Sequence, residues 1–188
     1  GEGCFREHGG LKVLHGNLGD SVIKISAVAP EHQHVKAPAK VFNDQYAVQD
    51  AYKKGELNCD CVIVVRYAGP AAVGMPELHK LMPVLGNLQK EGYHVALLTD
   101  GRLSGASGGI PSALHVSPEA VRGGKIALLQ DGDIIDFDAA GGQINCLTSL
   151  EGRVAKVPDL EAQEQTFGRW LFRTCRENVS EASSRATF

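Results

Sequence analysis

Two apolar runs, CVIVVRY at residues 61–67 and HVALLT at residues 94–99, restrict the possible folds of this chain more than any other feature. Runs in which almost every residue is apolar are typical of strands that are buried on both faces of a sheet. The segment between them carries apolar residues at helical spacing, namely Leu78, Leu81, Met82, Leu85 and Leu88. A strand, a helix and a second strand in this order predict a βαβ unit with at least partly parallel pairing.

The remaining segments extend this unit to a mixed α/β domain. Four further runs are predicted to be strands, at residues 21–28, 125–129, 133–139 and 143–148. The stretch LLQDGDII predicts a hairpin that turns at Asp131–Gly132. Helices are predicted near residues 46–52, between Pro76 and Gly92, and near residues 167–175.

Composition and charge exclude several classes of protein. With 188 residues, 43% of them hydrophobic, the chain can build the core of one ordinary domain. Its 19 basic residues are scattered among 22 acidic ones without a basic stripe, so we expect no nucleic acid as a partner. Five cysteines form no even disulfide framework, and no apolar run reaches membrane-spanning length, so we expect a cytoplasmic protein that does not contact membranes. Because the chain begins with Gly1, we expect a processed chain or a piece of a longer one.

Each strand of the predicted βαβ unit is followed by an unusual loop. The first loop is AGPAAVGMPELHK at residues 68–80, and the second is TDGRLSGASGG at residues 99–109. The carboxyl ends of parallel strands meet at one edge of a sheet, so the two loops can share one site. The glycines of the second loop let its backbone turn N–H groups toward a bound anion or a metal-held ligand.

Glu77 has two interpretations from the residues alone. It follows Pro76 at the predicted start of a helix, where the helix dipole stabilises an acidic side chain. Its carboxylate could equally be a ligand of Mg²⁺, which proteins hold with a few carboxylates and substrate oxygens. Both interpretations stay open at this point.

Other familiar site types fit this chain poorly. The stretch GASGG at 105–109 matches the pattern of a serine nucleophile at Ser107, but His115 is the last histidine and no acid stands between it and the serine. A phosphate-binding P-loop is excluded because its Gly-Lys-Ser/Thr end is missing. Cys59 and Cys61 lack the further ligands of a zinc or iron–sulfur site, so we interpret them as ordinary thiols. The histidines at 32 and 34 are interpreted as solvated loop residues.

Four stretches, in this order and at these separations, resemble the C-terminal domain of the dihydroxy-acid/6-phosphogluconate dehydratase family. They are GNLGDSVIKISAV (16–28), GPAAVGMPELHKLMPVLG (69–86), TDGRLSGASGGIPSALHVSPEA (99–120) and DGDII (131–135). The resemblance is greatest to the phosphogluconate branch, which the final stretch GRWLFRTCRENVSEASSRATF also resembles. Ala71 and Val73 depart from the family pattern, in which more polar residues are expected.

The resemblance implies an α/β fold in which mixed β-sheets form a barrel-like, swivelling β/β/α domain with flanking helices. It also implies that residues 1–15 are the remnant of an interdomain linker and that residues 16–188 are the C-terminal domain of a longer enzyme. The N-terminal domain of the same enzyme is then the principal partner, and it would bind an iron–sulfur cluster and most of the ligands of a Mg²⁺ ion shared between the domains. A homodimer is expected from the same family.

For function, the resemblance implies dehydration of 6-phosphogluconate, a sugar-acid phosphate, to 2-keto-3-deoxy-6-phosphogluconate in the Entner–Doudoroff pathway. Glu77 would contribute a carboxylate to the Mg²⁺, and Ser104 would be the base that removes the C2 proton. Arg102, Gly105 and Ser107 would contact the substrate, no residue of this chain would bind the cluster, and this domain alone would be inactive.

Several alternatives accompany these expectations. Arg102 could pair with a substrate anion or brace Asp100 within its loop. The substrate could be another sugar acid or a dihydroxy acid of the same family. The chain could also be a non-catalytic α/β domain that binds a small anion or mediates subunit contacts.

Overall fold

The two apolar runs form the centre of the fold, as the sequence predicts. They become β4 (Cys61–Val65) and β5 (Val95–Thr99), which pair in parallel. The chain between them contains α2 (Pro70–Val73) and α3 (Leu81–Lys90). All residues of both strands are buried. One face of each strand packs against helices, and the other face packs against residues of the other strands, inside the curved sheet. The predicted βαβ unit is therefore confirmed.

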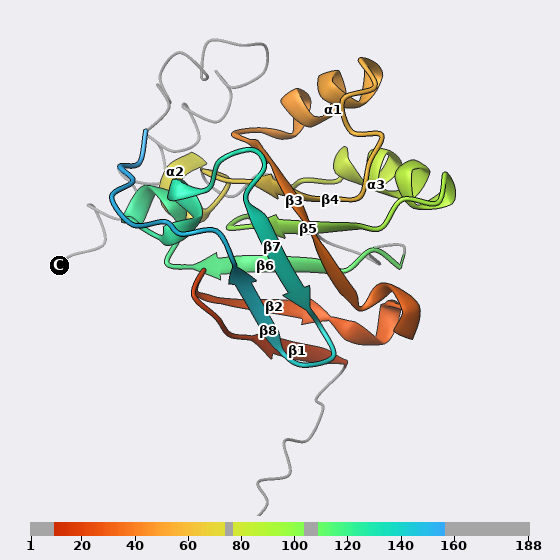
Figure 1. Cartoon of the computed structure of the whole chain (residues 1–188), viewed down its shortest axis with the longest axis horizontal. Helices are drawn as coiled ribbons and strands as arrows, with labels where there is room; N and C mark the ends of the chain where they lie inside the picture. The colour runs from red at the N-terminus through yellow and green to blue at the C-terminus, as the bar shows by residue number, and fades with distance from the viewer. Residues whose placement is uncertain (1–9, 74–76, 104–108, 157–188) are drawn as a thin grey trace, which may run out of the picture.

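The computed structural model describes residues 10–73, 77–103 and 109–156, and the eight strands in these residues form one mixed sheet (Figure 1). Its strand order is β1-β2-β6-β5-β4-β3-β7-β8. Strands β3 to β6 pair in parallel, and the outer pairs are antiparallel. The remaining strands are β1 (Leu11–Leu14), β2 (Asp20–Lys24), β3 (His34–Phe42), β6 (Ser112–Ser117), β7 (Ile134–Asp138) and β8 (Gln143–Cys146).

The two ends of this sheet meet and nearly close it into a barrel. The backbone N–H of His15 donates to the carbonyl of Gly142 at 2.9 Å, and the N–H of Ile144 donates to the carbonyl of His15 at 2.9 Å. The side-chain amide of Asn17 then bonds both the N–H and the carbonyl of Cys146, at 2.7 and 2.8 Å. A Cβ on Gly16 would lie 1.8 Å from the carbonyl oxygen of Ile144, so this approach of β1 to β8 requires glycine. The barrel-like α/β fold is confirmed.

Two apolar clusters stabilise the domain. One fills the barrel interior and includes Val62, Val64 and Phe137. The other lies between the outer face of β4 and β5 and the helices α1 (Gln45–Lys53) and α3, and it includes Ile63 and Leu85. Figure 1 shows these two helices together on one side of the sheet. None of the helices in the described segments is both long and apolar enough to span a lipid bilayer.

The predicted hairpin at Asp131–Gly132 is wrong. Residues 125–128 form a short 3-10 helix, η4 (Lys125–Leu128), and strand β7 pairs with β3 and β8 instead. The reason is a side chain distant in sequence: the guanidinium of Arg66 donates to the carbonyls of Ala127 and Leu129 at 2.8 and 2.9 Å. These carbonyls are therefore bonded to a side chain and not to a neighbouring strand.

Other differences from prediction lie at the strand boundaries. The strand predicted at 21–28 ends at Lys24, where a 3-10 turn, η1 (Ile25–Ala27), follows. Strands β1, β3 and β6 were not predicted, and β1 falls within the segment 1–15 that we expected to be a linker. In β3 the sequence signal is weak because Pro38 and two lysines interrupt it. The remaining 3-10 turns are η2 (Pro30–His32) and η3 (Ala120–Arg122).

The remaining predictions concern three helices and one histidine. The helix near 46–52 is confirmed as α1, and the helix predicted behind Pro76 begins only at Leu81. His34 is not in a loop, since it begins β3, where its exposed ring pairs with Asp136 of β7. The helix predicted near 167–175 lies outside the described residues.

Candidate functional site

The candidate site lies at the edge of the sheet where β4, β5 and β6 end. These strands are parallel, so the segments that follow them emerge on the same side (Figure 1). Asp100, which follows β5 and is only 2% exposed, joins these segments. Its carboxylate accepts hydrogen bonds from the backbone N–H groups of Tyr67, Ala68 and Ala120, at 3.1, 3.0 and 2.9 Å. One buried carboxylate therefore holds three loop segments together.

A second buried carboxylate, that of Glu119, reinforces the same edge. It accepts a hydrogen bond from the N–H of Ala71 at 3.2 Å and pairs with the guanidinium of Arg122 at 3.5 Å. A Cβ on Gly69 would lie 2.1 Å from the Glu119 carboxylate, so a larger residue at this position would displace that side chain from its present place. The loop after β4 and the Glu119 side chain are therefore closely packed.

Glu77 and Arg102 come from different loops and meet at this edge. They form an isolated parallel β-bridge, in which the N–H of Leu78 donates to the carbonyl of Arg102 at 3.3 Å. The guanidinium Nε of Arg102 lies 3.8 Å from the carboxylate of Glu77. The Glu77 side chain is 27% exposed and that of Arg102 is 52% exposed, so both groups can still reach a ligand. Two residues singled out from the sequence are thus brought together.

This geometry corrects the interpretation of Glu77 as a first-turn acid. Helix α3 starts at Leu81 and has no acidic residue in its first turn. Glu77 lies four residues earlier, in the bridge to Arg102, where the dipole of α3 does not stabilise it.

The structure also corrects one alternative for Arg102. The Asp100 carboxylate is held by the three backbone N–H groups described above, and the ion pair that Arg102 forms within the described segments is with Glu77. Arg102 therefore braces Glu77 and not Asp100. A contact between Arg102 and a substrate anion stays a prediction.

The predicted base and two predicted substrate contacts lie outside the described residues. These are Ser104, Gly105 and Ser107. Their roles stay predictions, as does the role of Glu77 as a metal ligand.

The described residues can supply only part of a metal site. In these segments no group of three or more His, Cys, Asp or Glu side chains could hold a metal ion. The carboxylate of Glu77 nevertheless has the hard oxygen atoms that Mg²⁺ prefers, and it stays partly exposed at the strand edge. It fits Mg²⁺ as one ligand of a site completed by groups from elsewhere.

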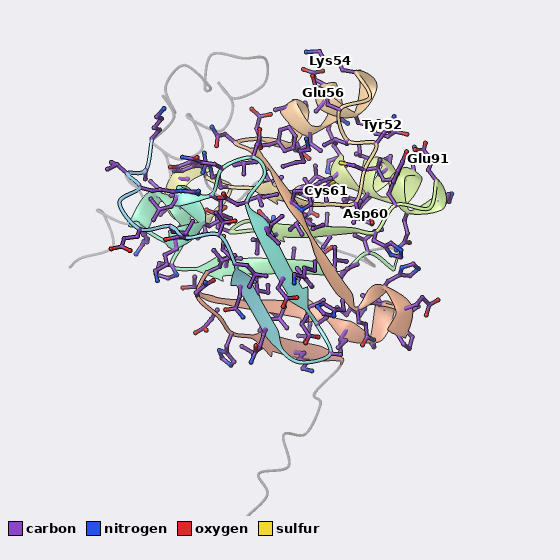
Figure 2. The ribbon with its side chains drawn as sticks, in the orientation of Figure 1. Tyr52, Lys54, Glu56, Asp60, Cys61 and Glu91 are labelled. Carbon is purple, nitrogen blue, oxygen red and sulfur yellow. The ribbon has the colours of Figure 1, made fainter. Side chains whose placement is uncertain are left out.

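The described cysteines do not fit an iron–sulfur cluster at this edge. Cys61 begins β4, at the opposite end of the strand from the candidate site, and Figure 2 shows it beside Asp60. Burial, followed by the neighbouring Cys59 thiol, raises the pKa of Cys61 to about 12. An iron–sulfur cluster is usually held by four cysteines, and in the described segments no three metal-binding side chains gather around Cys61.

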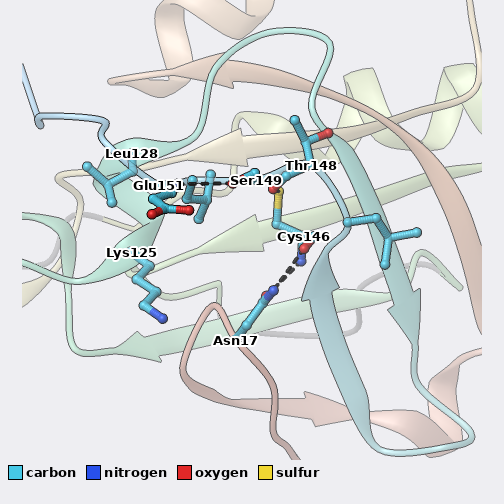
Figure 3. A pocket seen from close by; sticks show the side chains of 9 residues that line it. Asn17, Lys125, Leu128, Cys146, Thr148, Ser149 and Glu151 are labelled. Carbon is cyan, nitrogen blue, oxygen red and sulfur yellow. Dashed lines mark hydrogen bonds between the residues drawn. The ribbon is translucent and has the colours of Figure 1, made fainter.

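The cavity found in the described part of the chain lies elsewhere. It has a volume of about 450 Å³ and lies between η4 and the segment after β8, where Asn17, Lys125 and Cys146 contribute to its wall (Figure 3). Neither Glu77 nor Arg102 lines it. The candidate site is therefore separate from this cavity.

Sequence reasoning missed the two carboxylates that support the site. Asp100 had a recognisable signal, because it is a charged residue directly after a buried strand. Glu119 had none, since the backbone groups that it holds lie about fifty residues earlier in the chain.

The fold and the site together define an α/β barrel-like domain that presents a carboxylate and a guanidinium at the carboxyl edge of its parallel strands. A family model described as dihydroxy-acid/6-phosphogluconate dehydratase C-terminal matches residues 2–186, and the chain belongs to this family. The resemblance noted in the sequence is thereby confirmed.

The sequence identity of the chain differs between relatives from the two branches of the family. The phosphogluconate dehydratase of Escherichia coli K12 is 52% identical over 186 residues, covering 97% of this chain and 31% of the relative. That of Rhizobium meliloti strain 1021 is 53% identical over 181 residues, covering 95% and 30%. A dihydroxy-acid dehydratase of Acetivibrio thermocellus is 40% identical over 161 residues, covering 84% and 27%. The chain thus spans about 30% of the length of these relatives.

Proposed function

We propose that this chain is the C-terminal part of a phosphogluconate dehydratase, which removes water from 6-phosphogluconate to give 2-keto-3-deoxy-6-phosphogluconate in the Entner–Doudoroff pathway. The observation that carries the proposal is the difference in identity between the two branches. Relatives named phosphogluconate dehydratase reach 52–53% identity over nearly the whole chain, against 40% for a dihydroxy-acid dehydratase. The substrate could instead be another sugar acid or a dihydroxy acid, and the assay below distinguishes 6-phosphogluconate from a dihydroxy acid.

Within this proposal, Glu77 binds a Mg²⁺ ion that is shared with the N-terminal domain. Bound Mg²⁺ supplies positive charge that stabilises negative charge developing on the substrate. Arg102 keeps the Glu77 carboxylate in place from one side through its Nε. Because its side chain is about half exposed, the outer part of the guanidinium can also bind and orient an anionic group of the substrate.

Ser104 is the proposed base. It follows Arg102 by two positions in the chain and would take the proton from C2 of the substrate. A serine hydroxyl is almost fully protonated at neutral pH, so this role requires stabilisation of the alkoxide by neighbouring positive charge. Gly105 and Ser107 would hold the substrate through the same loop.

The rest of the enzyme is also part of the proposal. The N-terminal domain would bind the iron–sulfur cluster, as the family resemblance implies, and the described residues of this chain show no group of three metal-binding side chains. The family resemblance supports a homodimer, and the odd number of cysteines supports a cytoplasmic location.

The proposal is tested in the full-length protein by measuring turnover of 6-phosphogluconate and of a dihydroxy acid as a function of Mg²⁺ concentration. Wild type should prefer 6-phosphogluconate. Glu77→Gln should raise the Mg²⁺ concentration that gives half-maximal activity and lower turnover, with little change in melting temperature. Ser104→Ala should lower turnover by about 10²–10⁴-fold, because it removes the proposed base.

Two matched variants control for general effects of these substitutions. Glu91→Gln changes an exposed acid directly after α3, and Ser149→Ala changes an exposed serine after β8. Both should retain wild-type turnover and Mg²⁺ dependence. If Glu77→Gln behaves like Glu91→Gln in the Mg²⁺ titration, Glu77 is not a metal ligand.

A further inference from the structure

The backbone that carries Glu77 is held by a buried amide on helix α1. Gln45 is the first residue of α1 and is 8% exposed. Its Nε2 donates to the carbonyl of Glu77 at 3.3 Å, and its Oε1 accepts from the N–H of Lys80 at 3.3 Å. One partner is a carbonyl and the other is an N–H, so the amide can satisfy both in only one orientation. Gln45 therefore bonds both ends of the segment 77–80.

This segment is a short turn, in which the carbonyls of Leu78 and His79 accept from the N–H groups of Leu81 and Met82 at 3.0 and 3.2 Å. Lys80 is the N-cap of α3, and no side chain of the segment caps that helix. On the other side of the segment, the N–H of Leu78 bonds the carbonyl of Arg102. The backbone of Glu77 is thus fixed between Arg102 on the neighbouring loop and Gln45 on α1.

Helix α1 is well anchored and can act as a support. The side chain of Asp44 caps it by accepting from the N–H of Ala47 at 2.8 Å. Val48 and Ala51 are buried in the same apolar cluster as Leu78. A rigid helix at one end and a paired loop at the other leave the segment 77–80 few alternative positions.

We propose that Gln45 is a positioning residue for Glu77: it sets where the carboxylate stands relative to Arg102 and thereby how well Glu77 binds the metal. The inference rests on the proposed function, in which Glu77 is a Mg²⁺ ligand. Gln45 acts through the backbone carbonyl of Glu77 and the backbone N–H of Lys80. Loss of the amide leaves a part-buried carbonyl and a part-buried N–H with one bond fewer, so the segment should become looser.

The test uses the full-length protein with Gln45→Met, which keeps the length of the side chain but removes both hydrogen bonds. Two quantities are measured: the Mg²⁺ concentration for half-maximal activity, and the rate of hydrogen–deuterium exchange of a peptide covering residues 77–81. We expect exchange to become about fivefold to tenfold faster and the Mg²⁺ requirement to rise by a similar factor. Turnover at saturating Mg²⁺ should stay within about threefold of wild type, since the reacting groups remain.

Gln33→Met is the matched control. The Nε2 of Gln33 is also part-buried and donates to a backbone carbonyl, that of Val28 at 3.0 Å, which lies outside the segment 77–80. This variant should change the Mg²⁺ requirement by less than about twofold. Gln45→Glu serves as a second variant, because it keeps an acceptor for the N–H of Lys80 but loses the donor to Glu77. It should show the raised Mg²⁺ requirement even if Gln45→Met folds poorly.

The outcomes separate this inference from the proposed function. If Glu77→Gln raises the Mg²⁺ requirement but both Gln45 variants leave it unchanged, the positioning role is overturned and the proposed function stands. Faster exchange without a raised Mg²⁺ requirement also overturns the inference, because Gln45 would then be merely structural. If Glu77→Gln leaves the Mg²⁺ requirement unchanged, Glu77 is not a metal ligand and the inference fails with it, whereas the proposed substrate is tested separately by the comparison of 6-phosphogluconate with a dihydroxy acid.

Discussion

Buried carboxylates connect the loops of this domain at the scale of single residues. Asp100 binds three backbone N–H groups at the candidate site. Asp133, directly before β7, accepts from the N–H of Gln130 at 2.8 Å and from both terminal nitrogens of Arg153, one of them at 2.9 Å. A buried carboxylate is costly unless it is hydrogen-bonded or paired. An apolar residue in place of either aspartate would leave the backbone N–H groups that it binds without this partner.

Asp133 should make the stability of the domain sensitive to acid. Burial by itself raises the pKa of Asp133, but the hydrogen bond from Arg153, the N–H of Gln130 and the charge of Arg153 outweigh it, and the pKa is lowered. A carboxyl with a lowered pKa in the folded state stabilises the fold above its unfolded pKa of about 4, and this contribution is lost as the pH falls through the folded value.

We therefore expect Asp133→Asn to lower the free energy of unfolding by about 1–3 kcal/mol at neutral pH. The difference from wild type should shrink as the pH falls below about 4. Denaturant unfolding of both proteins at neutral and acidic pH measures this difference. A difference that does not depend on pH would show that the Asp133–Arg153 pair is not its source.

At the scale of elements, the junction of β1 and β8 decides whether the sheet is a barrel. The side-chain amide of Asn17 bonds both the N–H and the carbonyl of Cys146. It thus makes the two hydrogen bonds that the backbone of a neighbouring strand would make. Its own N–H donates to the side chain of Asn145 at 2.9 Å. Three hydrogen bonds of one residue thus connect the two ends of the sheet.

Asn17→Ala should weaken this junction. The N–H and carbonyl of Cys146 would each lose a partner, so we expect the free energy of unfolding to fall by about 1–3 kcal/mol. Asn87→Ala, on the exposed face of α3, is the control and should change stability by less than about 0.5 kcal/mol. The melting temperatures of the two variants give the comparison. Equal melting temperatures would mean that the junction contributes little.

At the scale of the whole molecule, the candidate site is incomplete. The chain spans about 30% of the length of its relatives, and at the site edge its described residues offer the partly exposed carboxylate of Glu77 without a group of three metal-binding side chains. We expect this chain alone to bind Mg²⁺ weakly and to show no dehydration of 6-phosphogluconate. Calorimetric titration with Mg²⁺ and an assay of the purified chain test this. Turnover by the chain alone would contradict the proposed division of the site between two domains.

The local sequence pattern was sufficient to predict the central strands of the fold and the family of the chain. Continuous apolar runs mark strands buried on both faces, and a helix between them enforces parallel pairing, so β4, β5 and the shared edge of their loops follow from the sequence. The loop residues Glu77 and Arg102 could be predicted to lie near each other for the same reason. The family motifs pointed to Ser104, whose role stays a prediction.

Tertiary structure alone decided what depends on contacts between distant residues. The side chain of Arg66 bonds the carbonyls of Ala127, within the turn Lys125–Leu128, and of Leu129, directly after it, and barrel closure depends on Asn17 meeting Cys146. Glu77 pairs with Arg102 and is held by Gln45 instead of starting a helix. A hydrogen bond between residues far apart in the chain leaves no periodic trace in either local sequence, which is why residue patterns predicted the strands but not these contacts.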